Sequence, residues 1–161
     1  MTESMRIAIA SDHGGYALKQ ELLMRLKDVA HEWTDFGCDS EASVDYPDYA
    51  IAVAKRVASG EFERGILLCG TGLGMCITAN KIPGIRAATV HDIFSAEATR
   101  AHNDCNILTM GGRVIEPALA EKIVRIWLET PYEGGRHARR LEKIEALEHE
   151  VQDAMQSGNS L

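Results

Sequence analysis

Short apolar runs rich in Ile, Val, Leu and Ala alternate with helical patterns along most of this 161-residue chain. Such alternation is typical of successive βα units around a mostly parallel sheet. Because the runs are apolar on both faces, helices should cover both sides of the sheet. The sequence predicts a single-domain, Rossmann-like α/β/α sandwich with a five-stranded parallel sheet. We expect strands near residues 6–10, 32–36, 65–69, 85–90 and 106–110, and helices at 16–30, 49–59, 74–81, 95–101 and 117–128.

The end of the chain does not follow this alternation of strands and helices. Pro131 and the pair Gly134-Gly135 end the fifth helix, and an extra C-terminal helix is expected over residues 136–155. We therefore expect one domain over residues 1–155. The remaining residues, 156–161, are polar, and we expect them to form a disordered tail.

Two arginines occupy an unusual place on this last helix. At 100° per residue, Arg136 and Arg140 fall on the same side as Ile144, Leu147 and Val151. Guanidinium groups on a face that must pack are costly unless they meet an anion there. The alternative is that both side chains snorkel at the rim of the apolar stripe.

Charge and cysteine content exclude several classes of partner. The 17 basic and 24 acidic residues give a net charge of −7, which opposes binding to nucleic acid and to anionic membranes. The N-terminal sequence MTESMRIAIA has no long apolar stretch of a signal peptide or spanning helix. The four cysteines show no CxxC spacing, so we expect reduced thiols and a cytoplasmic protein.

In an open parallel sheet, ligands bind outside the carboxyl ends of the strands. After the third expected strand comes a glycine-rich segment, Cys69 to Gly74, whose backbone N–H groups can converge on an anion. It matches a dinucleotide fingerprint only weakly, since the third glycine would fall on Met75. Asp92, twenty residues beyond Gly72, nevertheless keeps a non-catalytic nucleotide- or phosphate-binding module open as an alternative. A purely structural tight turn is a further alternative.

Cys69 and two histidines are the candidate acid/base groups. A thiol at the end of a strand, beside free amides and a helix N-terminus, is favoured as the thiolate and can act as a base. The alternative is that Cys69 is a small hydrophobe closing its strand. His13 and His102 lie in polar segments where an imidazole can move protons near neutral pH, although most histidines are surface or capping residues. We found no convincing metal-ligand spacing and expect no metal.

Five motifs follow one another between residues 5 and 150. They are Ser11-Asp12-His13-Gly14-Gly15, Val44-Asp45-Tyr46-Pro47-Asp48-Tyr49-Ala50, Cys69-Gly70-Thr71-Gly72-Leu73-Gly74 with Ala79-Asn80-Lys81, Arg100-Ala101-His102-Asn103-Asp104, and Tyr132-Glu133-Gly134-Gly135-Arg136-His137 ending at Arg140. Together they resemble the type B ribose-5-phosphate isomerase family, which also includes galactose-6-phosphate and allose-6-phosphate isomerases. The resemblance implies interconversion of D-ribose 5-phosphate and D-ribulose 5-phosphate without a metal or organic cofactor.

The resemblance also implies roles for particular residues. Cys69 matches the base that moves a proton between C2 and C1 of the sugar, His102 matches the residue that opens the furanose ring, and Thr71 is a candidate proton relay. Substrate contacts are implied for Asp12, His13, Gly70, Gly72, Leu73, Gly74, Asn103, Arg113, Arg136 and Arg140. Family members are homodimers or dimers of dimers, with each active site shared between two chains.

Two alternatives to a ribose-phosphate enzyme remain within this reaction class. The cysteine favours ribose phosphate, but pocket depth is not encoded in one sequence, so allose 6-phosphate or another six-carbon sugar phosphate stays open. A metal-dependent isomerase is the other alternative, which activity after exhaustive chelation would exclude.

Overall fold

The computed structural model describes residues 3–161 and contains one five-stranded sheet. All neighbouring strands pair in parallel, in the order β2-β1-β3-β5-β4. The expected α/β/α sandwich is confirmed. The strands are β1 (Arg6–Ser11), β2 (Glu32–Asp35), β3 (Arg64–Cys69), β4 (Ala87–Thr89) and β5 (Ile107–Gly111).

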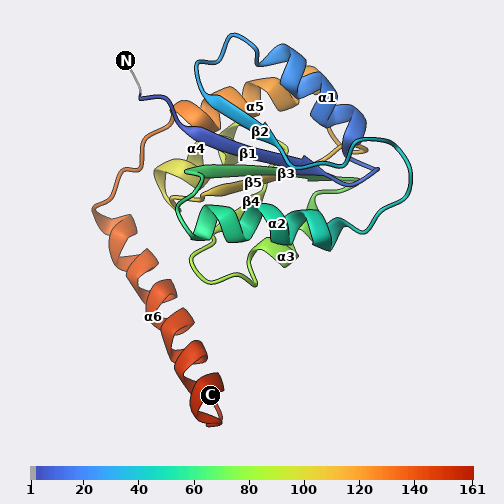
Figure 1. Ribbon diagram of the computed structural model, residues 1–161. Coiled ribbons are helices and arrows are strands. Elements are labelled where there is room, and N and C mark those ends of the chain that lie inside the picture. Colours follow the sequence, from blue (N-terminus) through green and yellow to red (C-terminus); the bar gives the residue numbers. More distant parts are fainter. Residues whose placement is uncertain (1–2) are drawn as a thin grey trace.

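Helices connect the strands and cover both faces of the sheet (Figure 1). One face is packed by α1 (Tyr16–Arg25), α4 (Ile93–Ala101) and α5 (Pro117–Glu129), and the other by α2 (Tyr46–Ala58) and α3 (Leu73–Ala79). This arrangement is expected because a parallel sheet buries both of its faces.

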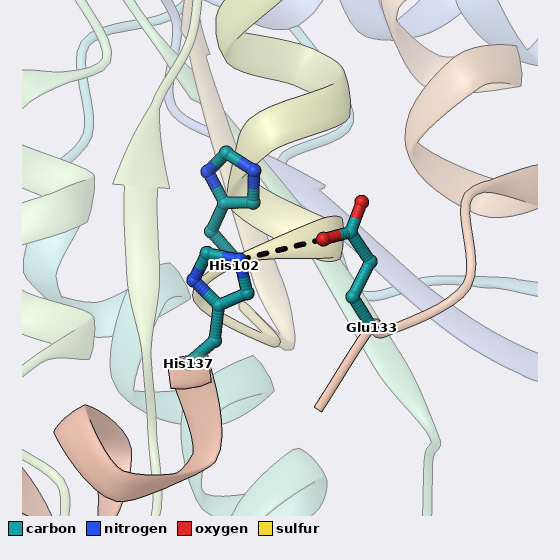
Figure 2. A group of neighbouring side chains, drawn as sticks. All are labelled: His102, Glu133 and His137. Carbon is teal, nitrogen blue, oxygen red and sulfur yellow. Dashed lines mark ion pairs between the residues drawn. The ribbon is translucent and has the colours of Figure 1, made fainter. Parts of the chain in front are cut away.

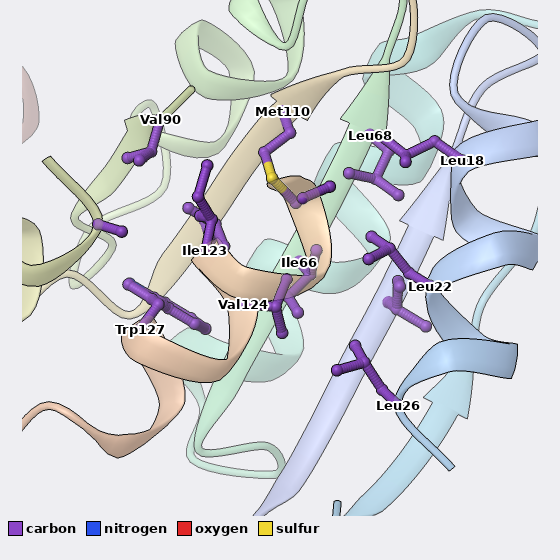
Figure 3. Packing of buried hydrophobic residues seen from close by; sticks show 14 of the residues in the cluster. Leu18, Leu22, Leu26, Ile66, Leu68, Val90, Met110, Ile123, Val124 and Trp127 are labelled. Carbon is purple, nitrogen blue, oxygen red and sulfur yellow. The ribbon is translucent and has the colours of Figure 1, made fainter. Parts of the chain in front are cut away.

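Alternating side chains in the central strands build two hydrophobic cores. In β1, Ile7 and Ile9 face α1 and α5, whereas the small residues Ala8 and Ala10 face α2. Figure 3 shows the first core, in which Trp127 and other side chains of α5 pack beside the leucines of α1 over the sheet. Cys69, the last residue of β3, belongs to the α2 side.

The edge strand β2 contradicts our expectation that every strand is apolar on both faces. Glu32, Thr34 and Asp35 are exposed there, and only Trp33 packs against the core. The reason is its position, because an edge strand needs polar side chains that discourage pairing with another chain. The first helix is also shorter than expected. It ends at Arg25, although Leu26 continues the apolar stripe and is buried.

The last helix, α6 (Arg136–Ser157), leaves the body of the domain and projects into solvent (Figure 1). Only His137 and Leu141 are buried along its 22 residues, while Ile144 and Leu147 are more than half exposed. The helix ends two residues later than expected, at a left-handed Gly158. Within residues 3–161 no helix is both long and apolar enough to cross a lipid bilayer.

Candidate active site

Three loops meet at the carboxyl edge of the sheet, after β1, β3 and β5. Their backbones touch at glycines, where a side chain would not fit. A Cβ on Gly14 would lie 3.0 Å from the backbone nitrogen of Gly70, and one on Gly112 would lie 2.6 Å from the carbonyl oxygen of Gly14. Gly72 has a left-handed φ of 80° and packs on the backbone of Met110. The amides of these loops are therefore held at fixed positions.

Cys69 stands at the centre of this edge. Its side chain is buried, and its Sγ accepts a hydrogen bond from the Gly72 N–H at 3.1 Å. The loop therefore presents a main-chain donor directly to the sulfur atom of Cys69. Cys105, which precedes β5, lies outside this loop, and burial raises its pKa to about 11, which leaves it an inert thiol. Thr71, in the same loop, is exposed and accepts a weak bond from the Leu73 N–H at 3.3 Å.

Asp12 and His13 are oriented by the neighbouring backbone. The Asp12 carboxylate is buried, and its Oδ1 accepts hydrogen bonds from the N–H groups of Gly14 at 2.8 Å and Gly15 at 3.1 Å. The Val44 N–H donates to His13 Nδ1 at 3.2 Å. Since Nδ1 is the acceptor, the proton of a neutral His13 lies on Nε2 and is available to a ligand.

Arg113 completes the group at the carboxyl edge. Its backbone N–H donates to the Gly70 carbonyl at 3.0 Å, and its guanidinium lies over the bare Cα of Gly70. A Cβ at Gly70 would come within 3.0 Å of Arg113 Nη1. The side chain is exposed, so its donors can reach an anion outside the sheet.

The other expected site residues gather at the opposite, amino edge of the sheet. His102 caps the C-terminus of α4, and Asn103 follows it. The Glu133 N–H donates to the Ala101 carbonyl at 3.0 Å, which ties the start of α6 to this point. The ring of His102 stacks on that of His137, with centroids 4.3 Å apart and planes 12° from parallel (Figure 2).

Arg136 and Arg140 follow from the same edge along α6, and both are exposed. Arg140 Nη1 donates to the Arg136 carbonyl at 3.3 Å, so the two side chains lie one turn apart. Neither guanidinium packs within the apolar cores of residues 3–161, which leaves both available to an anion.

One chain does not bring the two groups together. Cys69 pairs in register with Gly111, the last residue of β5, while His102 precedes the first residue of that strand, Ile107. The four-residue step from Gly111 back to Ile107 alone spans about 13 Å. The expected residues thus form two half-sites on opposite edges of the sheet.

Two structurally important residues were missed by the sequence analysis. His91 Nε2 accepts a hydrogen bond from the Gly111 N–H at 2.9 Å, and burial lowers the pKa of this histidine. Lys19 is fully buried, where its Nζ donates to Asp35 Oδ1 at 2.8 Å and to the Cys38 carbonyl. It anchors the segment leading to Val44 and thus to His13. The position of His91 after the fourth strand was a signal that could have been followed, whereas Lys19 offered none.

Known proteins are similar to this chain in sequence and in fold. The ribose-5-phosphate isomerase B structure from Clostridium thermocellum superimposes with a TM-score of 0.89 at 51% identity, covering 91% of this chain and 99% of that one. A putative sugar phosphate isomerase, YwlF, from Bacillus subtilis is 57% identical over 145 residues, 89% of this chain and 97% of the relative. The ribose-5-P isomerase B of Listeria innocua is 49% identical over 144 residues, again 89% and 97%.

Fold, site and relatives define the class of protein as an aldose–ketose isomerase. The family model described as Ribose/Galactose Isomerase matches residues 7–144 of the chain. The chain belongs to this family, as the motifs in its sequence indicated. Membership of an isomerase family argues against the alternative of a non-catalytic nucleotide-binding module.

Proposed function

We propose that the protein interconverts D-ribose 5-phosphate and D-ribulose 5-phosphate through an enediolate. The observation that carries this proposal is the contact between Cys69 Sγ and the Gly72 N–H at 3.1 Å, in a loop whose other amides are fixed by glycine contacts. Proton abstraction next to a carbonyl needs a base and preorganised donors where negative charge develops. The loop from Cys69 to Gly74 provides both the base and the donors.

The residue roles follow from the order of chemical steps. His102 moves a proton from the anomeric hydroxyl to the ring oxygen as the furanose C1–O4 bond breaks. The Cys69 thiolate then takes the proton from C2, and the resulting thiol returns it to C1. Thr71 relays a proton between the two sugar oxygens. No cofactor takes part, because the proton only moves within one sugar.

The remaining residues bind the substrate. Asp12, His13, Asn103 and the amides of Gly70, Gly72, Leu73 and Gly74 surround the reacting carbons and hydroxyls. Arg113, Arg136 and Arg140 bind the phosphate, whose binding energy orients the distant carbons. Local guanidinium groups dominate the field at an anionic substrate, so the net charge of −7 is no obstacle.

The proposal requires a homodimer as the smallest working unit, in which dimers can pair further. His102, Asn103, Arg136 and Arg140 lie at the amino edge, away from Cys69 of the same chain. A second copy has to supply them. The uncovered apolar side chains of α6, Ile144 and Leu147, offer the surface on which that copy packs.

A coupled assay for ribulose 5-phosphate tests the reaction, with ribose 5-phosphate and allose 6-phosphate supplied in parallel. We expect turnover of the pentose phosphate, and we expect it to survive exhaustive chelation. Absence of turnover together with saturable nucleotide binding would overturn the proposal. A preference for allose 6-phosphate would show that the substrate is a six-carbon sugar phosphate, while the proposed aldose–ketose isomerisation would stand.

Mixing two inactive variants tests the shared site. Cys69→Ala and His102→Ala are refolded together or exchanged as subunits. In a mixed dimer one site carries both lesions and the other carries none, so random mixing restores about a quarter of the wild-type sites. A site formed within one chain would show no recovery. Cys69→Ala exchanged with itself is the control.

We further propose a cytoplasmic location. Its support is the four free cysteines Cys38, Cys69, Cys76 and Cys105, since unpaired thiols persist in reducing compartments. Blocking of accessible thiols in intact cells, followed by fractionation, tests it. Disulfide-linked species recovered from an extracellular fraction would contradict this location.

A further inference from the structure

Three potential metal-ligating side chains meet at the amino edge of the sheet: His102, Glu133 and His137. Their nearest ligand atoms all lie within 4.8 Å of one another. His102 is the C-terminal cap of α4, Glu133 lies in the linker before α6, and His137 lies in the first turn of α6; the Glu133 N–H to Ala101 carbonyl bond holds these segments together. In Figure 2 the two imidazole rings lie face to face, with the carboxylate beside them.

One buried nitrogen of this cluster, Nε2 of His137, lacks a hydrogen-bond partner among the described residues. The residue is only 9% exposed, and its Nε2 is buried without a hydrogen bond to any of residues 3–161. Glu133 Oε2 lies 3.4 Å from this nitrogen, within ion-pair range but outside hydrogen-bond geometry. A buried imidazole nitrogen without a partner costs free energy, so the site favours a ligand that can bind it.

Access to the cluster is open on one side. A pocket of about 110 Å³ is lined by His102 and Glu133 together with Phe94, Glu97, Ala98 and Ala101. The Glu133 side chain is 58% exposed, so it can rotate freely toward the two rings. An ion in this pocket contacts His102 and Glu133, and the buried His137 stacks on the first and lies 3.4 Å from the second.

We propose that His102, Glu133 and His137 bind a divalent transition-metal ion of the Zn²⁺ type. Two imidazoles and one carboxylate form a donor set that Zn²⁺ prefers, with its fourth position left to water or an anion. Ligand atoms about 2 Å from such an ion are about 3.3 Å apart, so the cluster must contract by rotation of its side chains. The exposed Glu133 and the half-buried His102 supply this movement.

The site has a consequence for the reaction. A metal ion on His102 takes the lone pair that ring opening requires, so the bound ion inhibits the enzyme. This consequence rests on the proposed role of His102, whereas metal binding itself does not. The bound ion is thus an inhibitor of the reaction and not a cofactor for it.

Titration of the chelator-treated full-length protein with Zn²⁺, followed by calorimetry, tests the site. We expect stoichiometric binding, and with Co²⁺ as a spectroscopic probe we expect visible bands without thiolate-to-metal charge transfer. Glu133→Gln alters an exposed side chain and preserves folding, and we expect it to weaken Zn²⁺ binding at least about tenfold. His137→Ala should weaken binding as much, with folding checked by circular dichroism.

Matched controls separate this site from other ligands. His149→Ala removes an exposed histidine of the same helix and should leave Zn²⁺ affinity unchanged, as should Cys69→Ala. No binding by the wild-type chain at millimolar Zn²⁺, or binding lost only in Cys69→Ala, would overturn the proposal. A separate measurement asks whether Zn²⁺ lowers turnover of ribose 5-phosphate and whether EDTA restores it. If Zn²⁺ binds but does not lower turnover, the inhibitory role is refuted and the metal site still stands.

Discussion

The carboxyl and amino edges of the sheet are built on different principles. At the carboxyl edge, backbone packs on backbone, and Asp12, His13 and Cys69 all form hydrogen bonds with main-chain amides. At the amino edge, side chains from α4 and α6 meet with few bonds between them, and His137 Nε2 has no hydrogen-bond partner among residues 3–161. Main-chain hydrogen bonds therefore fix the side chains of the first half-site, whereas few hydrogen bonds fix those of the second.

The largest effect is expected from removing Cys69, the proposed base at the carboxyl edge. Cys69→Ala should lower kcat by at least about 10²-fold, because proton transfer from carbon loses its general base. Steady-state kinetics with ribose 5-phosphate measures this loss. Cys76→Ala, a change in the next helix, serves as the matched control and should leave kcat near the wild-type value. Near-normal turnover of Cys69→Ala would show that Cys69 is not the general base.

At the amino edge, loss of His102 should affect only part of the reaction. His102→Ala is expected to lower turnover of cyclic ribose 5-phosphate by about 10²-fold, the range of general acid/base catalysis. An open-chain substrate analogue that needs no ring opening should lose much less. Parallel kinetics with both substrates measures the difference. Equal losses would place His102 outside the ring-opening step.

The arginines on α6 should act on binding more than on chemistry. Arg136→Ala is expected to raise KM about tenfold with kcat nearly unchanged, because phosphate contacts are shared by the ground and transition states. Arg139→Ala changes an exposed arginine of the same helix that points elsewhere, and it should have little effect. A large fall in kcat at constant KM would mean that Arg136 takes part in the chemical steps.

The smallest effect is expected from His91, which supports β5 at the carboxyl edge. Burial lowers its pKa below the ordinary 6.5, so the unfolded chain binds this proton more readily than the folded one. Its contribution to stability is complete above pH 6.5 and is lost as pH falls through the folded pKa. Urea unfolding at pH 7.5 and 5.5 should show a larger loss for wild type than for His91→Gln. An identical pH dependence of the two proteins would contradict this assignment.

The sequence predicts the carboxyl edge well for a physical reason. In a parallel sheet the chain leaves every strand at the same edge, so the segments after β1, β3 and β5 must converge, and Asp12, Cys69 and Arg113 could be located from strand ends alone. The length of α1 was less predictable. Leu26 is buried and keeps the helical period, yet the helix has already ended at Arg25.

The amino edge was predictable only in part. Helical periodicity singled out Arg136 and Arg140, and a polar segment singled out His102, before the family resemblance implied their roles. The stacking of His102 on His137 was not predictable, because it depends on how α6 is tied to the end of α4. These two histidines are far apart in sequence, so no spacing rule for metal ligands detects them together. Their meeting is a property of the tertiary structure.

The glycines that touch across the three loops limit how this enzyme can change. A single added methyl group on Gly14, Gly72 or Gly112 would push one loop off its neighbour, and the sulfur atom of Cys69 would move with it. We therefore do not expect substitutions in these three loops to adapt the site to a different sugar, because they would displace Cys69. In the proposed dimer, new substrate preferences would come instead from substitutions in α6, which can change without disturbing the loop that holds Cys69.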